Sequence, residues 1–535
     1  MYYNYRLKKL QKMKNTKLLI LFSISILIFF SNVIFTDKIF FFRDILNLFH
    51  PYRLFAAENI QNGIIPIWNP YTFFGQPFLA NPETSLFYPF TILFYIFGFP
   101  VAYKLFIVLH FFLAAILFYM AARFLKAKNS YSLIASVAWA FGGYLVARIE
   151  FLSILGAAIW LPLSIIFLIQ NKKMLLGLVF AIQIFAGHPQ VFFYTIIFSL
   201  FFLNKKRVIT LICSLLIAFL LTAVQFLPFT EFVKNSNRAK GLTYEEASSV
   251  SLTPSEIIRN LFPKKNIDIT GNYWLKSFYI GIIPLIFVFV YFITSDKKLL
   301  LPLIIIAILA LGRNTPVYLF LYNFFPPFSK IRYPAAIMFL FAFVLCLMVS
   351  QVTVKKITKF IPLILTLTLS DLYYNSIKLN PKISSKLLNI KTENIFKLQK
   401  ISKGEKFLVF PDVYSQKLGC FDFINTLPTN INIPHHIYNA NGYDPITTTG
   451  IENLIEGLKK NIDAKKLSEY NIKYIITNKN IDSNWERITK NLYENKFHSM
   501  ITINPQIFQP KHFYFLLGLW LTLFSTVVIL AHLVK

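Results

Sequence analysis

The sequence predicts a mainly α-helical protein that crosses a membrane many times and carries one small soluble α/β module. First, its 535 residues are 56% hydrophobic and 17% aromatic, a balance that excludes a soluble protein of this length. Second, apolar stretches close to the roughly 20 residues needed to cross a bilayer recur along the chain. Third, residues 371–511 depart from this pattern, because polar residues interrupt the apolar runs there.

The apolar stretches predict about twelve membrane helices. The first follows a basic N-terminal segment and is too long for a signal-peptide core, so we expect it to be retained. Two stretches, 174–187 and 190–203, are short for full crossings, and a re-entrant hairpin with Gly187, His188 and Pro189 at its tip fits equally well. The expected spans are 18–36, 101–125, 131–148, 151–170, 174–187, 190–203, 207–229, 277–294, 298–312, 334–353, 357–370 and 512–534.

Lysine and arginine residues predict the orientation of these spans. The formal charge of +30 would suit nucleic acid, but the spans divide the basic residues into short clusters, so we expect no nucleic-acid partner. The clusters fall on alternate sides of the predicted spans, and the positive-inside rule assigns them to the cytoplasm. This predicts a protein of the cytoplasmic membrane with both termini inside, and with the first loop (37–100) and residues 371–511 outside.

The soluble module has the periodicities of an α/β fold. Residues 404–412 and 471–479 alternate apolar and polar side chains as strands do, and 452–470 has helical spacing. The predicted domains are a membrane domain (1–370), an outer module (371–511) and a final membrane helix (512–535).

Cofactor signals are weak. The cysteines are Cys213, Cys346 and Cys420, of which two lie inside apolar spans, and the adjacent His435 and His436 have no Cys or carboxylate at ligand spacing. The sequence contains no common nucleotide-binding or hydrolase motif. We expect no cofactor and no metal site, although a divalent cation stays open.

The first outer loop carries the main candidate for chemistry. Asp44 lies in a stretch with helical periodicity along the membrane interface, where a carboxylate suits a general base or a group that orients an acceptor hydroxyl. The alternative is a surface ion pair of Asp44 with Arg43 or Arg53. The turns around Trp68 to Pro77 predict a rigid, shaped loop, which favours the functional interpretation.

Further polar residues lie at the outer ends of predicted spans. Arg148 and Glu150 either line an aqueous cavity or form a helix-end salt bridge, with equal support. His188 at its break suits a phosphate oxygen or a proton shuttle, or else a hydrogen bond at a helix end. Gln225 continues the polar rim, and Arg332 is one of several arginines that suit a phosphodiester or diphosphate. Anchoring to lipid headgroups is the alternative for these arginines.

Several runs of the sequence together carry a resemblance. In chain order they are RDILNLFHPYRLF (43–55), WNPYTFFGQPFLA (68–80), AGHPQ (186–190), QFLPFTEFVKNSNR (225–238), GRNTPVYLFLY (312–322), IRYPAA (331–336) and NGYDP (441–445). As an ordered set that covers nearly the whole chain, these runs resemble YfhO-type bacterial membrane proteins. Members of that family are similar to the GT-C class of glycosyltransferases.

The resemblance implies a GT-C-like fold and an enzyme that takes a sugar from a polyprenyl-phosphate carrier. In that class an acidic residue of the first outer loop is the catalytic centre, and Asp44 is the position here that fits. The class often has a paired acidic motif, and this chain departs from it because Arg43 precedes Asp44.

The residues and the resemblance lead to one hypothesis. The carrier enters sideways from the outer leaflet of the membrane lipids, and Arg148, His188 and Arg332 hold its phosphate. Asp44 accepts the proton of an acceptor hydroxyl, whose oxygen attacks the anomeric carbon and inverts it. The acceptor would be an envelope glycan, lipid or protein. Two alternatives are a transporter or flippase for a lipid-linked or anionic envelope precursor, and a non-catalytic scaffold of envelope assembly.

Overall fold

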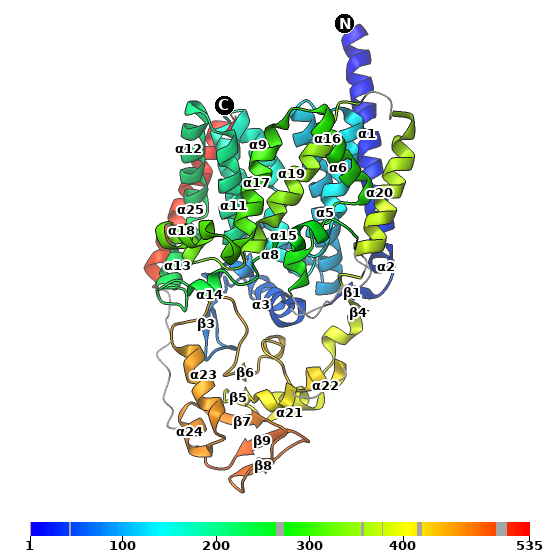
Figure 1. Cartoon of the computed structure of the whole chain (residues 1–535). Coiled ribbons are helices and arrows are strands. Elements are labelled where there is room, and N and C mark those ends of the chain that lie inside the picture. Colours follow the sequence, from blue (N-terminus) through cyan, green and yellow to red (C-terminus); the bar gives the residue numbers. More distant parts are fainter. Residues whose placement is uncertain are drawn as a thin grey trace. The chain divides into compact units, whose positions relative to one another are not determined.

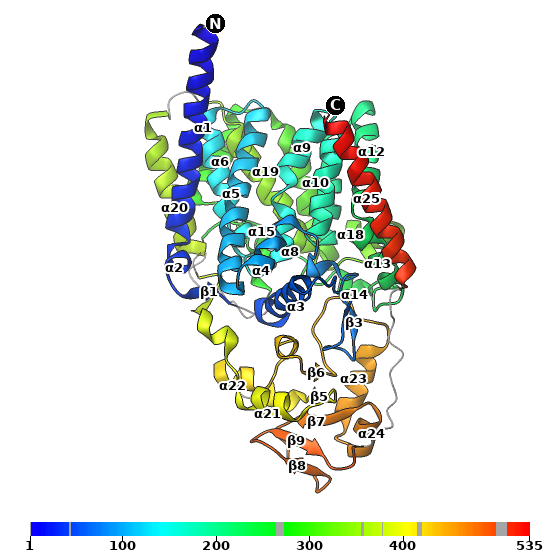
Figure 2. The same cartoon turned by 180° about the vertical axis from the view of Figure 1, so that it is seen from behind.

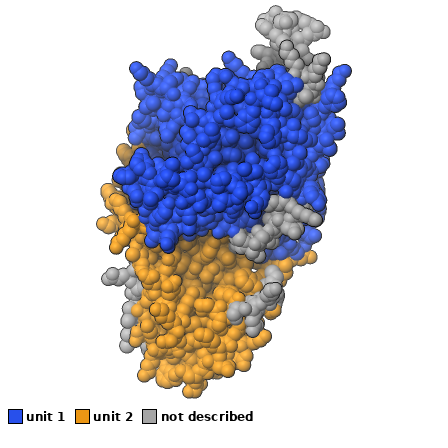
Figure 3. Space-filling model, in the orientation of Figure 1, with its two compact units in different colours: residues 1–41, 103–219, 242–384 blue, residues 42–102, 220–241, 385–535 orange. Residues whose placement is uncertain are grey.

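The computed structural model describes residues 2–41, 44–263, 272–354, 358–376, 378–414, 420–498 and 511–534. This part of the chain is mainly helical, as the sequence predicts. It forms two compact units, which have different colours in Figure 3. Unit 1 comprises Met1–Phe41, Tyr103–Phe219 and Leu242–Ser384, and unit 2 comprises Phe42–Ala102, Leu220–Gly241 and Ser385–Lys535.

Unit 1 is a helical assembly around α19 (Met338–Ser350). Every side chain of α19 is buried, and it packs against α6 (Asn129–Phe141), α16 (Ile282–Thr294) and α17 (Leu300–Ala310) (Figure 1). A helix that is apolar on all faces needs this enclosure. Other helices largely or wholly in this unit are α1 Tyr2–Phe29, α2 Ser31–Ile34, α5 Phe99–Phe124, α7 Gly143–Val146, α8 Leu152–Ala158, α9 Leu161–Ile169, α10 Lys173–Phe185, α11 Pro189–Ser199, α12 Lys205–Leu221, α14 Tyr244–Ala247, α15 Pro254–Arg259, α18 Pro316–Phe324 and α20 Ile361–Ser376. Strand β1 (Lys38–Phe40) pairs antiparallel with β4 (Lys382–Ser384).

The predicted membrane spans coincide with single helices or with consecutive ones. Among the described residues, three segments are long and apolar enough to cross a membrane, judged by length and composition: Phe99–Phe124, Leu152–Ile169 and His512–Ile529. The pair α12 and α13 (Ala223–Lys234) adds a fourth if it counts as one span. The total of twelve spans stays a prediction.

The prediction of one helix over 207–229 is wrong, because the helix breaks at Thr222. The backbone N–H of Val224 donates to the hydroxyl of Thr522, 3.0 Å away, instead of continuing the α12 ladder. Thr522 belongs to α25 (His512–Val534), which packs along α13 and is red in Figure 2. A side chain on a neighbouring helix therefore replaces a bond that an unbroken helix would make.

Unit 2 contains a five-stranded mixed sheet in the order β6-β5-β7-β9-β8. Strand β5 pairs in parallel with β6 and β7, while β9 is antiparallel to both β7 and β8. The strands predicted at 404–412 and 471–479 are confirmed as β5 and β7. The bounds are β5 Lys406–Val409, β6 Tyr438–Asn439, β7 Ile472–Ile476, β8 Trp485–Arg487, β9 Leu492–Asn495, α21 Glu393–Ile401 and α22 Cys420–Asn425.

The helix predicted at 452–470 is two helices, α23 (Ile451–Lys460) and α24 (Ala464–Glu469). Asp463 separates them, because its side chain accepts the backbone N–H groups of Lys465 and Lys466. An aspartate in this role favours the start of a new helix over continuation of the old one.

Most of the predicted first outer loop, residues 42–100, folds into unit 2. Its strands β2 (Trp68–Asn69) and β3 (Gln76–Pro77) form a hairpin, and the tip residues Phe73 and Phe74 enter a hydrophobic core with residues of β5, α23 and β7. Both phenylalanines have positive φ (53° and 61°), which is rare outside glycine and is offset here by burial. The other helices of the loop are η1 Ile45–Phe49, α3 His50–Gln61 and α4 Ile92–Ile96.

Candidate functional site

Asp44 lies immediately before η1, the helical turn that continues into α3 in unit 2. The helix predicted for this stretch is confirmed. Oδ1 of Asp44 accepts a hydrogen bond of 2.7 Å from the hydroxyl of Tyr443, which is 399 residues further along the chain. Tyr443 belongs to the NGYDP run, so the candidate base is in direct contact with the sheet-containing part of the unit.

The two basic neighbours of Asp44 in the sequence have different outcomes. Arg43 lies outside the described residues. Arg53 is 1% exposed, its guanidinium lies over the rings of Phe49 and Phe94, and Nη1 donates to the carbonyl of Thr84. Arg53 is therefore a buried cation that joins α3 to Thr84, and not a surface group.

Asp444, next to Tyr443, is a half-buried residue whose carboxylate binds the segment predicted as the first outer loop. Its Oδ2 accepts hydrogen bonds from the hydroxyl of Tyr52 at 2.6 Å and the amide of Asn81 at 2.5 Å, and Oδ1 accepts the backbone N–H of Ile446 at 3.0 Å. Burial raises the pKa of Asp444 from its ordinary value to about 7, although these hydrogen bonds act in the opposite direction. The carboxyl group thus titrates near neutral pH.

Gln225, the other predicted residue in unit 2, supports the same loop. It is 2% exposed, and its amide nitrogen donates to the carbonyls of Leu79 and Asn81 at 3.3 and 3.5 Å. These are long hydrogen bonds to the backbone. They give Gln225 a role in positioning the segment that contacts Asp444.

Arg148 in unit 1 is held by aromatic rings. It is 1% exposed, and its guanidinium carbon lies 4.3 Å from the ring centre of Tyr144 and 4.7 Å from that of Trp274. Nη1 donates to the carbonyl of Trp274. The remaining nitrogens Nε and Nη2 have no hydrogen-bond partner among the described residues. A buried, always-charged group with donors to spare suits an anionic ligand.

His188 caps the start of α11, and Gln190 of the same helix contacts the backbone of Arg332. The Gln190 amide donates to the carbonyl of Arg332 at 2.7 Å, and Nδ1 of His188 accepts the N–H of Val191 as α11 begins. The positive charge of Arg148 also acts on the imidazole of His188. The helix-end hydrogen bond expected as one interpretation of His188 is therefore present.

Trp274 and Tyr333 connect these basic residues. Their rings meet edge to face at 6.1 Å, and the guanidinium of Arg332 lies 5.0 Å from the ring centre of Tyr333. Tyr333 has φ of 66°, a left-handed conformation that costs energy for a residue with a side chain. Strain at such a position is frequent at functional sites.

Glu150 completes the set in unit 1. It is 1% exposed and acts electrostatically on Arg148 and on the hydroxyl of Tyr103. The carboxylate of Glu150 therefore partly offsets the positive charge of the Arg148 guanidinium.

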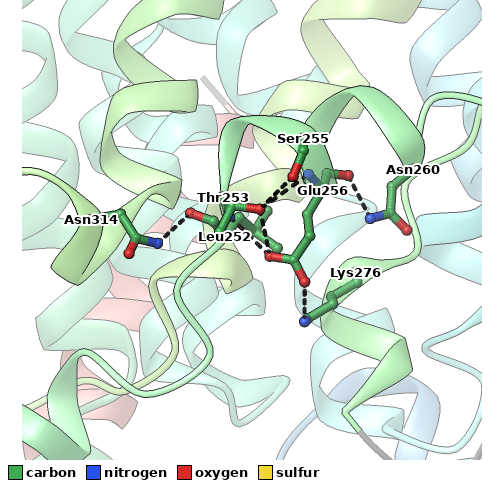
Figure 4. A network of polar contacts seen from close by, with 7 residues as sticks. All are labelled: Leu252, Thr253, Ser255, Glu256, Asn260, Lys276 and Asn314. Atoms are coloured by element: carbon green, nitrogen blue, oxygen red, sulfur yellow. Dashed lines mark hydrogen bonds and ion pairs between the residues drawn. The ribbon is translucent and has the colours of Figure 1, made fainter.

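A polar network fixes the turn η5 (Tyr273–Lys276), which carries Trp274. The ammonium of Lys276 lies 2.6 Å from Oε1 of Glu256, and Oε2 of Glu256 accepts the N–H of Thr253 in a capping box at the start of α15 (Figure 4). The amide of Asn314 donates to the carbonyl of Leu252 in the same network. These contacts connect η5 to α15 and hold the indole in place.

The site residues do not line the cavity next to this network. That cavity, of about 40 Å³, is bordered by Asn260, Lys276, Tyr279 and Asn375 among others, and it has room for water molecules. Within the described ranges, no group of three or more His, Cys, Asp or Glu residues is placed to hold a metal ion.

Several residues of the site were not predicted as such. Trp274 carries no spacing signal, because it meets Arg148 only in the folded chain. Tyr144 precedes Arg148 by four residues, and this helical spacing was a signal for the pair. The one signal for Tyr443 and Asp444 was the NGYDP run. It contributed to the family resemblance but indicated no role for either residue. Tyr333 directly follows Arg332, and an aromatic residue beside a predicted cation was the available hint.

The mainly helical fold and its long apolar segments are those of a membrane protein. The chain belongs to the YfhO family of bacterial membrane proteins, since the family model described as "Bacterial membrane protein YfhO" matches residues 81–410. No curated protein matches the chain.

Solved structures with a similar fold are glycosyltransferases. The cryo-EM structure of the arabinofuranosyltransferase AftD from Mycobacteria has a TM-score of 0.54 and 14% identity over 86% of this chain. Its R1389S mutant (class 2) has the same TM-score and identity over 87%. The chain spans only 35% of the length of AftD. The oligosaccharyltransferase of Archaeoglobus fulgidus has a TM-score of 0.46 and 12% identity over 86% of this chain and 68% of its own.

Proposed function

We propose that this protein is a glycosyltransferase of the cytoplasmic membrane, with about twelve spans, that moves a sugar from a polyprenyl-phosphate carrier to an envelope acceptor on the outer face. The observation that carries the proposal is the buried guanidinium of Arg148 with donors to spare. Because the fold is similar to that of GT-C glycosyltransferases, we interpret this anion site first as the phosphate site of a transferase.

The proposed reaction assigns one step to each group. Asp44 accepts the proton of an acceptor hydroxyl, and the oxygen attacks the anomeric carbon from the face opposite the phosphate. The bond between that carbon and the phosphate oxygen breaks, and the polyprenyl phosphate leaves with the bonding electrons. Arg148, His188 and Arg332 bind the phosphate and stabilise the charge that develops on it. The sugar arrives with inverted configuration, and Asp44 then releases its proton to water.

The test compares cells that carry the wild-type chain, no chain, or Asp44→Asn. Loss of the chain should cause one polyprenyl-phosphate sugar to accumulate and one envelope glycan to lose that sugar. Asp44→Asn should reproduce both effects, with transfer at least about 100-fold slower, while membrane levels of the protein stay normal. Wild-type transfer by Asp44→Asn would overturn the base assignment. Movement of a lipid-linked sugar across vesicles without transfer would support a transporter instead.

A further inference from the structure

The side chain of Asn430 holds two distant segments of unit 2 in one arrangement. Its amide nitrogen donates to the carbonyl of Asn47 and to the carbonyl of Tyr443, both at 2.7 Å. Its amide oxygen accepts the hydroxyl of Thr72 at 2.9 Å and the N–H of Tyr443 at 3.2 Å. An asparagine side chain has two N–H donors and two acceptor positions, so Asn430 uses all four.

This arrangement has consequences for Asp44. Asn47 lies three residues after Asp44 in the same helical turn, and Tyr443 is the residue whose hydroxyl reaches the Asp44 carboxylate. Asn430 therefore fixes the backbone beneath both members of the Tyr443–Asp44 hydrogen bond. Asn430 itself is fully buried and has φ of 72°, so its position is set by the fold and not by solvent.

Asp444 fixes the same loop from the other side of Tyr443. It takes hydrogen bonds from Tyr52 in α3 and from Asn81. The Tyr443 ring, held on both sides along the backbone, is itself 41% exposed. The backbone of Tyr443 is fixed on both sides, while its phenol ring is half exposed. The Tyr443 hydroxyl can therefore bind the Asp44 carboxylate at a position that a substrate can also reach.

We propose that Tyr443 is the positioning residue for Asp44, its hydroxyl orienting the carboxylate for the acceptor. This rests on the proposed function, because it assigns the role of base to Asp44. Tyr443 forms no bond with the sugar in this scheme and transfers no proton. Its contribution is a hydrogen bond to a charged group, which is stronger than one between neutral groups.

The experiment uses the full chain in phospholipid vesicles, with a panel of radiolabelled undecaprenyl-phosphate monosaccharides as donors and isolated cell envelope as acceptor. Tyr443→Phe removes one oxygen and should lower kcat between about 10- and 100-fold with the KM for the donor unchanged. The control is Tyr493→Phe, a tyrosine of β9 distant along the chain, which should keep wild-type kcat. Protease resistance of the vesicle-bound protein checks that both variants are folded.

A double-variant cycle separates positioning from general support of the fold. In the Asp44→Asn background, Tyr443→Phe should cause no further loss, because the carboxylate that it orients is gone. Equal losses with and without Asp44 would overturn the proposal, as would wild-type kcat for Tyr443→Phe while the wild-type chain transfers sugar. Absence of transfer by the wild-type chain with every donor would overturn the proposed function, and this proposal with it.

Discussion

The hydroxyl of Tyr52 donates a hydrogen bond of 2.6 Å to the half-buried carboxylate of Asp444, across 392 residues of sequence. This contact connects α3 to the NGYDP run. Burial disfavours the charged form of the Asp444 carboxyl group more than this hydrogen bond favours it, so the stability of unit 2 depends on pH.

The first prediction concerns that pH dependence. The pKa of Asp444 is raised to about 7, above its value in an unfolded chain, so the folded state holds its proton more tightly. This contribution to stability is complete below about pH 4 and is lost as the pH rises through 7. It amounts to as much as about 4 kcal/mol. Urea midpoints of the protein in detergent at pH 5 and pH 8 should show it.

The matched variant is Asp444→Asn, which cannot ionise and should lose this part of the pH dependence. His435 acts in the opposite direction, because burial lowers its pKa to about 4 and its contribution is lost on acidification. The informative quantity is therefore the difference between wild type and Asp444→Asn at each pH. A constant difference from pH 5 to pH 8 would contradict the prediction.

The positions of helices could be predicted from sequence, but their breaks could not. Apolar runs of about 20 residues located every described helix of membrane length, because burial in lipid requires such runs. The break at Thr222 depends on Thr522, and the break before α24 depends on the cap made by Asp463. The first is a tertiary contact that periodicity does not contain, while the second is a local signal hidden inside helical spacing.

In the candidate site, the charged residues could be predicted from sequence, but their partners could not. Asp44, Arg148 and Arg332 were identifiable, because charged residues beside apolar spans are costly unless they have a use. Their partners were not, since Trp274 reaches Arg148 and Tyr443 reaches Asp44 over long sequence separations. One sequence contains no information that pairs residues so far apart.

The second prediction concerns Gly442. A Cβ at this position would lie 2.2 Å from the ring of Phe73, so Gly442→Ala must displace the loop tip from its core. We expect a loss of about 1–3 kcal/mol in stability of unit 2, measured by urea unfolding or limited proteolysis. Gly457→Ala is the control, because nothing lies within 4 Å of its Cβ and alanine favours the helix α23. Equal stability of the two variants would refute the packing argument.

The third prediction concerns the contact of α25 with α13. A Cβ at Gly518 would lie 2.3 Å from the carbonyl oxygen of Ala223, so the two backbones approach closely because residue 518 is glycine. Gly518→Leu should separate the helices and lower the thermal midpoint in detergent by several degrees. Val527→Leu adds bulk on an exposed face of the same helix and should leave the midpoint unchanged. A normal midpoint for Gly518→Leu would show that the close approach is dispensable.

The fourth prediction separates a ligand-binding role of Arg148 from a structural one. Arg148→Lys keeps the charge but loses the planar guanidinium that stacks on Tyr144 and Trp274, so we expect the donor KM to rise about tenfold with little change in kcat.

Arg123→Lys is the control, because Nη1 of Arg123 also donates to a backbone carbonyl, that of Ala127, at the predicted cytoplasmic end of α5. A purely structural Arg148 would instead lower thermal stability while the remaining folded protein keeps its donor KM. Arg148→Met should abolish binding of the donor phosphate, since no charge remains, and a near-normal KM in that variant would exclude Arg148 from the phosphate site.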